Sequence, residues 1–189
     1  MKKPEHSDQA AIEKEMRTSF EASLPSQVER ASRIKVQKFI PHHWFATAAS
    51  ECASMYVTGF FYGAISVSQA YVEALSKFLV ESHGLRQSKD PKIRWKKLLE
   101  EKVVSKTTHD AAVSVFDKRN DYHHLNKEVE QDCRELEERA ETCLHNLHTI
   151  ETEIFAHSFD KPGILTPHEP RYWPEERPGM VRVNLRKVW

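Results

Sequence analysis

The chain has 189 residues, which is enough for one domain with appendages and a sizeable buried core. Its 28 basic residues balance its 28 acidic residues, so no overall charge draws it toward nucleic acid or a membrane surface. With 39% hydrophobic and 30% charged residues, the composition is typical of a globular protein and excludes an intrinsically disordered chain.

The sequence shows no sign of secretion or of a membrane span. Its first residues are polar and lack the apolar core of a secretory signal. The most apolar run, residues 55–80, contains Glu73 and several serines, so we expect a buried helix and no membrane contact. The three cysteines form no CxxC pair, which favours reduced thiols and a cytoplasmic location. They are Cys52, Cys133 and Cys143.

Residues 1–40 are expected to form an N-terminal helical extension. Residues 8–38 have the pattern of one or two amphipathic helices, with a break near Pro25 because proline lacks an amide donor. Ser26 would then cap the second helix.

Residues 41–158 are expected to form the main domain, and every element predicted in it is a helix. An Ala-rich helix spans 44–56, and Gly59 marks a joint. The next helix, from 60 to about 82, has apolar residues at spacings of three and four and ends at His83-Gly84.

Short helices and then one long helix complete the domain. Asp90-Pro91 has the cap and first-turn residues of a short helix, and Thr108 or Asp110 begins another. A long helix is predicted over 121–157, with one buried and one charged face. Its apolar positions are Leu125, Val129, Leu136, Ala140, Leu144, Leu147, Ile150 and Ile154.

Residues 159–189 are expected to form an extended, Pro-rich C-terminal tail. Five prolines forbid a continuous helix, and residues 181–186 alternate between apolar and polar as a short strand or extended arm would. We expect this arm to lie across the domain or to reach a second subunit. Its aromatic anchors are Tyr172, Trp173 and Trp189.

The segment from Phe116 to Leu125 concentrates residues that can act on a phosphodiester. The guanidinium of Arg119 can hold a phosphate by two hydrogen bonds, and the imidazole of His124 can take and return a proton near neutral pH. Asn120 lies four residues before His124, on the same face of a helix. A helix that begins here would add free amides that favour an anion.

These residues resemble a known family motif. Arg119-Asn-Asp-Tyr-His-His124 is similar to the Arg-polar-x-x-x-His motif of the HEPN superfamily of small helical domains. The likeness covers roughly residues 44–157: an apolar helix, an insert of short helices, and a long helix after the motif. It implies an all-α, up-down helical bundle. Arg139 and His145 match the same spacing, but they lie in mid-helix with no polar residue after the Arg.

The resemblance implies a metal-independent endoribonuclease that cuts RNA without a cofactor. His124 would be the acid–base group, Arg119 the phosphate ligand, and Asn120 the residue that orients one of them. Members commonly form homodimers in which two motifs share one cleft, and many are toxins or antiviral defence proteins with an antitoxin or defence-system partner. Some toxin members carry a Tyr two residues after the His, which a partner modifies. Asn126 stands there in this chain, so that control is not expected.

The resemblance also leaves a second interpretation open. Some members of the family have lost catalysis and act as scaffolds. The chain would then be an inactive helical adaptor of a defence or toxin system.

Other residues could assist RNA binding. His123 neighbours His124 and could contact the substrate or replace it as the working residue. Lys96 and Lys97 lie in a stretch, residues 82–106, with eight basic and three acidic residues, and could meet an RNA backbone. Trp95 could stack on a base, or it could belong to the core with the lysines facing solvent.

Two further clusters have both a functional and a structural interpretation. His145 and His148, with Glu141 or Glu151, could hold Zn²⁺, but the spacing completes no diagnostic motif and no metal is expected. Glu73 could orient His124, or it could be a boundary residue whose carboxylate reaches water.

Overall fold

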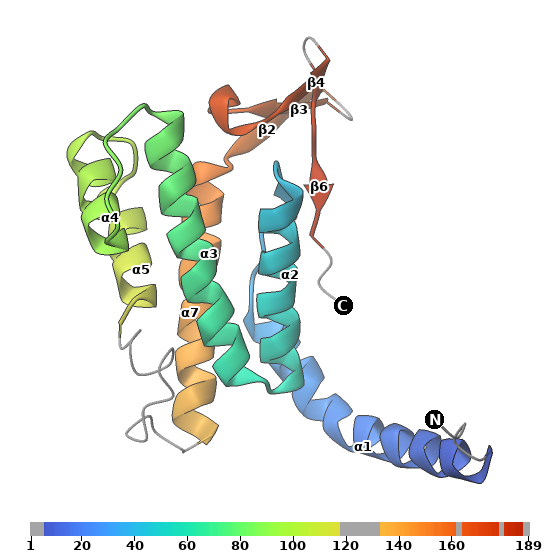
Figure 1. Cartoon of the computed structure of the whole chain (residues 1–189). Coiled ribbons are helices and arrows are strands. Elements are labelled where there is room, and N and C mark those ends of the chain that lie inside the picture. The colour runs from blue at the N-terminus through green and yellow to red at the C-terminus, as the bar shows by residue number, and fades with distance from the viewer. Residues whose placement is uncertain (1–5, 118–132, 162–163, 178–179, 187–189) are drawn as a thin grey trace, which may run out of the picture.

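The computed structural model describes residues 6–117, 133–161, 164–177 and 180–186 (Figure 1). The described chain is mostly helical, with small two-stranded sheets, and it belongs to the all-α class as the sequence predicts. Its helices are α1 (His6–Arg33), α2 (His43–Thr58), α3 (Phe61–Ser82), α4 (Pro91–Glu100), α5 (Lys106–Val115) and α7 (Cys133–Ile154). Its strands are β1 (Phe39–Ile40), β2 (His157–Lys161), β3 (Ile164–Pro167), β4 (Glu175–Arg177), β5 (Met180–Val181) and β6 (Asn184–Leu185). None of the described helices is long and apolar enough to cross a membrane.

The core lies among α2, α3 and α7, which run side by side, with α4 and α5 packed on the outer side of α3 and α7 (Figure 1). The buried face of α3 follows the predicted spacing of three and four residues. Removal of these apolar side chains from water stabilises the fold, at about 25 cal/mol per Å² buried. The fully buried members on α3 include Ile65, Val72, Leu75 and Leu79.

The predicted joint between the first two core helices is confirmed. Gly59 ends α2 with a φ of 89°, in the left-handed region that glycine enters at little cost. Its N–H donates to the carbonyl oxygen of Tyr56, and the next N–H, of Phe60, donates to that of Met55 at 2.7 Å. This pattern satisfies carbonyls at the helix end and turns the chain back so that α3 packs on α2.

The short helices begin at polar caps, one predicted correctly and one not. The carboxylate of Asp90 accepts a hydrogen bond from the N–H of Lys92 at 2.8 Å, as the sequence predicts. The predicted start of α5 at Thr108 or Asp110 is wrong, because Ser105 caps the helix instead. The carboxylate of Glu153, on α7, holds the hydroxyls of both Ser105 and Thr108 and thereby selects the earlier start.

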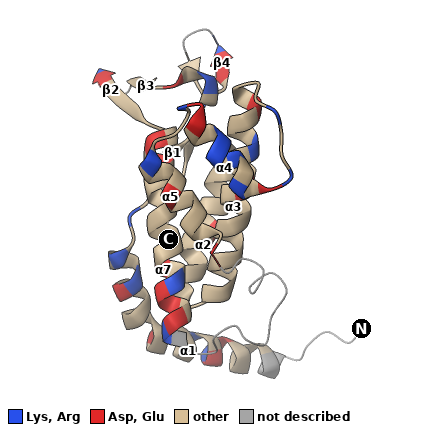
Figure 2. Cartoon of the chain, turned by 90° about the vertical axis from the view of Figure 1, so that its left-hand side faces the viewer, with Lys and Arg blue, Asp and Glu red and all other residues tan. Residues whose placement is uncertain are grey.

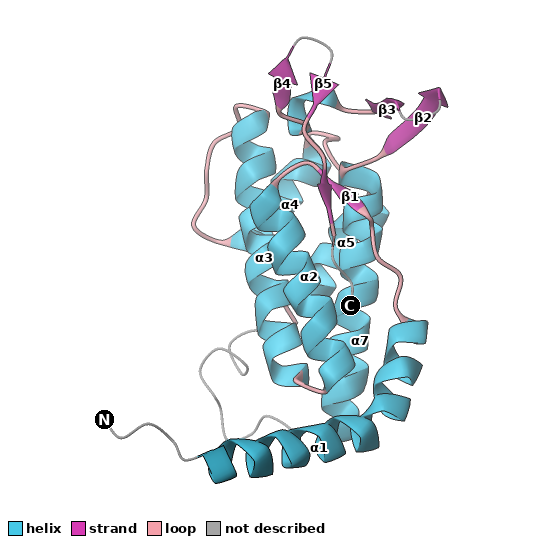
Figure 3. Ribbon diagram, turned by 90° about the vertical axis from the view of Figure 1, so that its right-hand side faces the viewer, coloured by secondary structure: helices cyan, strands magenta, loops and turns pink. Residues whose placement is uncertain are grey.

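Residues 6–33 form one helix, so the predicted break near Pro25 is wrong, and the helix ends before the predicted residue 38. Ser26 does not act as an N-cap, since its hydroxyl donates to the carbonyl oxygen of Ser23 at 2.8 Å within α1. Figure 3 shows that α1 nevertheless bends before it meets the loop to β1. A proline inside a helix removes one hydrogen bond and explains such a bend.

After α7 the described chain forms short extended segments. The helix ends at Ile154, earlier than the predicted 157, and His157 begins the β2–β3 hairpin. Strand β4 pairs with β5, and β6 pairs antiparallel with β1, so that Ile40 faces Asn184. The arm therefore lies across its own domain, one of the two expected placements. Tyr172 and Trp173 are buried anchors, while Trp189 lies outside the described residues.

Candidate functional site

The four motif residues that the sequence singles out lie outside the described residues. They are Arg119, Asn120, His123 and His124. Their roles therefore stay predictions, and the structure bears on them only through the two described ends of the chain that flank residues 118–132.

The N-terminal flank is held by Arg139 of α7. Its guanidinium donates to the carbonyl oxygens of Ser114 at 2.7 Å and of Asp117 at 3.0 Å. These carbonyls lie in and just after the last turn of α5, where a helix end carries partial negative charge, so a cation there is favourable. Arg139 thus has a structural task, which agrees with favouring Arg119 over Arg139 as the motif arginine.

Two amide side chains fix the same corner of the fold. Gln69, buried on α3, donates to the carbonyl oxygen of Val115 at 3.1 Å, and Asn146 of α7 donates to the hydroxyl of Ser114 at 3.2 Å. The end of α5, which leads into residues 118–132, is therefore fixed by both α3 and α7.

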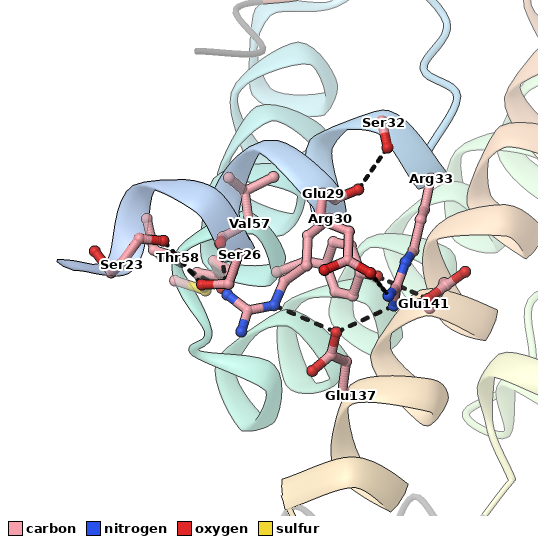
Figure 4. Close-up of polar contacts among 12 residues, drawn as sticks. Ser23, Ser26, Glu29, Arg30, Ser32, Arg33, Val57, Thr58, Glu137 and Glu141 are labelled. Carbon is pink, nitrogen blue, oxygen red and sulfur yellow. Dashed lines mark hydrogen bonds and ion pairs between the residues drawn. The ribbon is translucent and has the colours of Figure 1, made fainter. Parts of the chain in front are cut away.

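The C-terminal flank, the first turns of α7, is tied to α1 and α2 by a cluster of charges (Figure 4). Glu137 accepts hydrogen bonds from Arg30 and Arg33, each at 3.3 Å. Glu141 accepts from the hydroxyl of Tyr56 at 2.8 Å and lies 3.5 Å from Arg33. Burial and the neighbouring Glu141 raise the pKa of Tyr56, so the hydroxyl stays a proton donor. The cluster fixes where α7 begins to run along the bundle.

The proposed phosphate ligands on α4 face solvent. Lys96 is exposed and lies 3.7 Å from Glu100, while Lys97 is half-buried on the same helix. Figure 2 shows basic residues gathered on α4. Both lysines are therefore placed where they can reach an anion in solution.

The neighbours of these lysines are structural. Trp95 is fully buried, so it belongs to the core and is not available to stack on a base. Arg94 is also buried, and it donates to the hydroxyl of Ser76 at 2.8 Å and lies 3.8 Å from Glu73. Glu73 in turn lies 2.9 Å from the ammonium of Lys77. Glu73 thus joins α3 to α4 and sits at the boundary of the core.

A metal site at the histidines of α7 is not formed by the described side chains. No group of three His, Cys, Asp or Glu residues among the described residues is arranged to hold a metal ion. His145 lies 3.8 Å from Glu141, but Glu151 points into the core and pairs with Arg186. Glu151 is therefore not available to His148 as a zinc ligand.

Sequence reasoning missed the ion pair between Glu151 and Arg186. The two side chains are 0% and 1% exposed, and their nearest oxygen and nitrogen are 2.9 Å apart. Arg186 also donates to the carbonyl oxygen of Ala49 on α2 at 2.6 Å. Burial raises the pKa of Glu151, and the guanidinium opposes that shift. The signal was present: Glu151 falls on the apolar stripe of α7, four residues after Leu147 and three before Ile154.

Comparison with known proteins gives no relative from which a role could be transferred. The chain matches no protein-family model, no curated protein and no solved structure.

Proposed function

We propose that the chain is a metal-independent endoribonuclease of HEPN type, with Arg119, Asn120 and His124 as its catalytic residues. The observation that carries the proposal is the sequence Arg119-Asn-Asp-Tyr-His-His124, placed between the short helix α5 and the long helix α7. Among the described residues, the apolar helix α3 is followed by the short helices α4 and α5 and then by the long helix α7, and this order supports the proposal.

The reaction needs only protein groups. His124 removes the proton of the ribose 2′-hydroxyl, whose oxygen attacks phosphorus while the bond to the 5′ oxygen breaks. The protonated imidazole returns a proton to that leaving oxygen, and the product ends in a 2′,3′-cyclic phosphate. Arg119 neutralises the charge that develops on the phosphoryl oxygens, and Asn120 orients one of the two groups. Lys96 and Lys97 on the exposed side of α4, with His123, contact the RNA away from the cleaved bond.

The biological setting follows from the same resemblance. The chain acts on RNA in the cytoplasm as a toxin or antiviral defence protein, and it works as a homodimer. An antitoxin or another protein of the defence system holds it in check.

The test is cleavage of single-stranded RNA by the purified chain in excess chelator. Wild type leaves 2′,3′-cyclic ends, and His124→Ala loses at least about 100-fold in rate, within the range that general acid–base catalysis supplies. His145→Ala is the matched control, because this exposed histidine of α7 belongs to the discounted second match and should keep full activity. Equal cleavage by wild type and His124→Ala would refute the proposal.

A second candidate is the catalytically silent adaptor, and one observation favours it. Several large apolar side chains of α1 are exposed, which is typical of a surface that binds protein. An adaptor forms a stable complex with another protein and does not turn over RNA in the assay above. Truncation at Lys161 would not separate the two functions, because it removes Arg186 and leaves Glu151 buried without its partner.

A further inference from the structure

The first half of α1 lacks support from the rest of the described fold. Every residue from 9 to 22 is exposed, and α1 runs away from the lower end of the bundle (Figures 1 and 3). An isolated helix of that length is marginal in water, where about 12–15 residues are needed even in favourable sequences. A helix in this position gains its stability from something that packs on it.

An apolar ridge runs along this helix. Its members are Ile12, Met16, Phe20, Leu24 and Val28, and they are 42–68% exposed. The spacing is four throughout, so successive side chains rotate by about 40° around the axis. A coiled coil alternates spacings of three and four, which keeps its stripe straight. A ridge of constant spacing four fits instead between the same ridges of another helix, at a crossing angle of about −50°.

The charges beside the ridge fit a second copy of the same helix in antiparallel orientation. The residues that follow the five ridge residues lie on one flank: Glu13, Arg17, Glu21, Pro25 and Glu29. If two copies cross antiparallel at Phe20, Arg17 of one copy comes beside Glu21 of the other, and the reverse. Arg17 bonds Glu13 at 3.2 Å with both side chains largely exposed, so its guanidinium stays accessible.

The other flank permits close approach. Ser19 and Ser23 precede Phe20 and Leu24 and are small. Two helix backbones can therefore come near the 8–10 Å that helix packing requires.

The size of the ridge matches a dimer. A stable interface buries about 800 Å² on each partner, of which about 65% is apolar in homodimers. Five large apolar side chains exposed by about half supply apolar area on the order of 500 Å². One ridge thus has about the apolar area that one side of such an interface needs.

The base of α1 keeps the ridge away from its own bundle. Arg30 donates to the carbonyl oxygen of Val57 at 3.0 Å and its guanidinium lies over the ring of Phe61, at 5.1 Å from the centroid. Arg30 and Arg33 also hold Glu137 of α7 (Figure 4). With its base fixed to α2, α3 and α7, the helix presents the ridge outward.

We propose that the apolar ridge of α1 is a homodimer interface, in which two copies cross antiparallel at Phe20. Phe20 meets Phe20 at the two-fold axis, and Met16 of each copy packs beside Leu24 of the other. This interface lies outside residues 44–157 and does not depend on the nuclease activity.

The test is the mass of the full-length particle by sedimentation. Phe20→Glu should halve the mass at concentrations where wild type is associated, with a dissociation constant raised about 30-fold or more, as for a central interface residue. Ala22→Glu is the matched control: it adds the same charge on the same helix, about 200° away from Phe20 on an exposed position, and should leave the mass unchanged. Circular dichroism of both variants checks that the bundle stays folded.

The antiparallel register has its own test. When Met16→Cys and Leu24→Cys chains are mixed and oxidised, disulfides should form between the two different chains and not between two copies of Met16→Cys. A wild-type monomer, an unchanged mass for Phe20→Glu, or cross-links between identical Met16→Cys chains would each overturn the proposal. An association that responds equally to Phe20→Glu and Ala22→Glu would also overturn it.

Discussion

Replacement of Arg186 by methionine should destabilise the protein strongly, because Glu151 is then left in the core without its ionic partner. The side chains of Arg186 and Glu151 are essentially inaccessible to water. The guanidinium of Arg186 donates hydrogen bonds to the carboxylate of Glu151 at 2.9 Å and to the carbonyl oxygen of Ala49 at 2.6 Å. Loss of one member of a buried pair costs about 3–5 kcal/mol of the free energy of unfolding. This is a large share of the 5–15 kcal/mol that a domain of this size typically has.

The loss should depend on pH with a definite sign. Burial raises the pKa of Glu151, so the folded carboxyl holds a proton at a pH where the unfolded one has lost it. Folding is then less favourable as pH rises through that interval. Without Arg186 the largest influence that opposes burial is gone, so Arg186→Met should lose more of the free energy of unfolding at pH 8 than at pH 5. Urea unfolding of wild type and Arg186→Met at pH 5 and at pH 8 measures this loss.

Two further variants test whether the loss of stability comes from the unpaired Glu151 or from a general disruption of the C-terminal arm. Arg182→Met removes a cation from the same arm, but its pair with Glu176 is exposed at both ends, so the loss should stay below about 1 kcal/mol. The double variant Glu151→Leu/Arg186→Met removes both charges and should recover most of the stability. Equal losses for Arg182→Met and Arg186→Met, or no recovery in the double variant, would refute the reasoning.

Three other outcomes follow from the structure. Gly59→Ala should lower the free energy of unfolding by about 1–2 kcal/mol in denaturant titration, since its φ of 89° is strained for any side chain with a Cβ, and Gly59→Asn should cost less. Asp90→Ala should cost about 1 kcal/mol through loss of the α4 cap, whereas Asp90→Asn should cost little, because it retains the accepting oxygen. Burial and then Arg171, whose guanidinium lies 3.0 Å from Nδ1, lower the pKa of His83. NMR titration should therefore place that pKa below 6.5, with the stability from His83 present above pH 6.5 and lost as the pH falls, and Arg171→Met should move the value upward.

Local signals in the sequence were sufficient for much of the helical fold. The sequence predicts the caps at Gly59 and Asp90 because glycine tolerates the left-handed φ of a helix end, and because an Asp directly before Pro91 marks a helix start. The start of α5 was missed because Ser105, Thr108 and Asp110 are all acceptable caps, and the choice among them depends on Glu153, which is 48 residues away from Ser105. The predicted break at Pro25 was wrong because the rule on proline does not say whether a helix stops or only bends.

The candidate site was predictable only in part, because a local pattern shows which face of a helix is exposed but not which distant residues pair. Lys96 faces solvent and Lys97 lies at the edge of the exposed face because Trp95 and Leu98 of the same helix take the buried face. This is a consequence of helical period that the sequence displays. Arg186 gave no such indication, since a charged residue in an alternating arm normally faces water and its partner Glu151 lies in a helix formed independently.

The pairing of β6 with β1 has a consequence for the order in which the protein folds and opens. Asn184 bonds the carbonyl oxygens of Ile40 and Pro41, across 144 and 143 positions of the chain, whereas neighbouring helices such as α2 and α3 meet across one turn. Contacts of such long range form slowly because a large loop must close before they contribute. We therefore expect the arm to dock after the helices have assembled, and its release to expose Glu151 while α2, α3 and α7 remain packed.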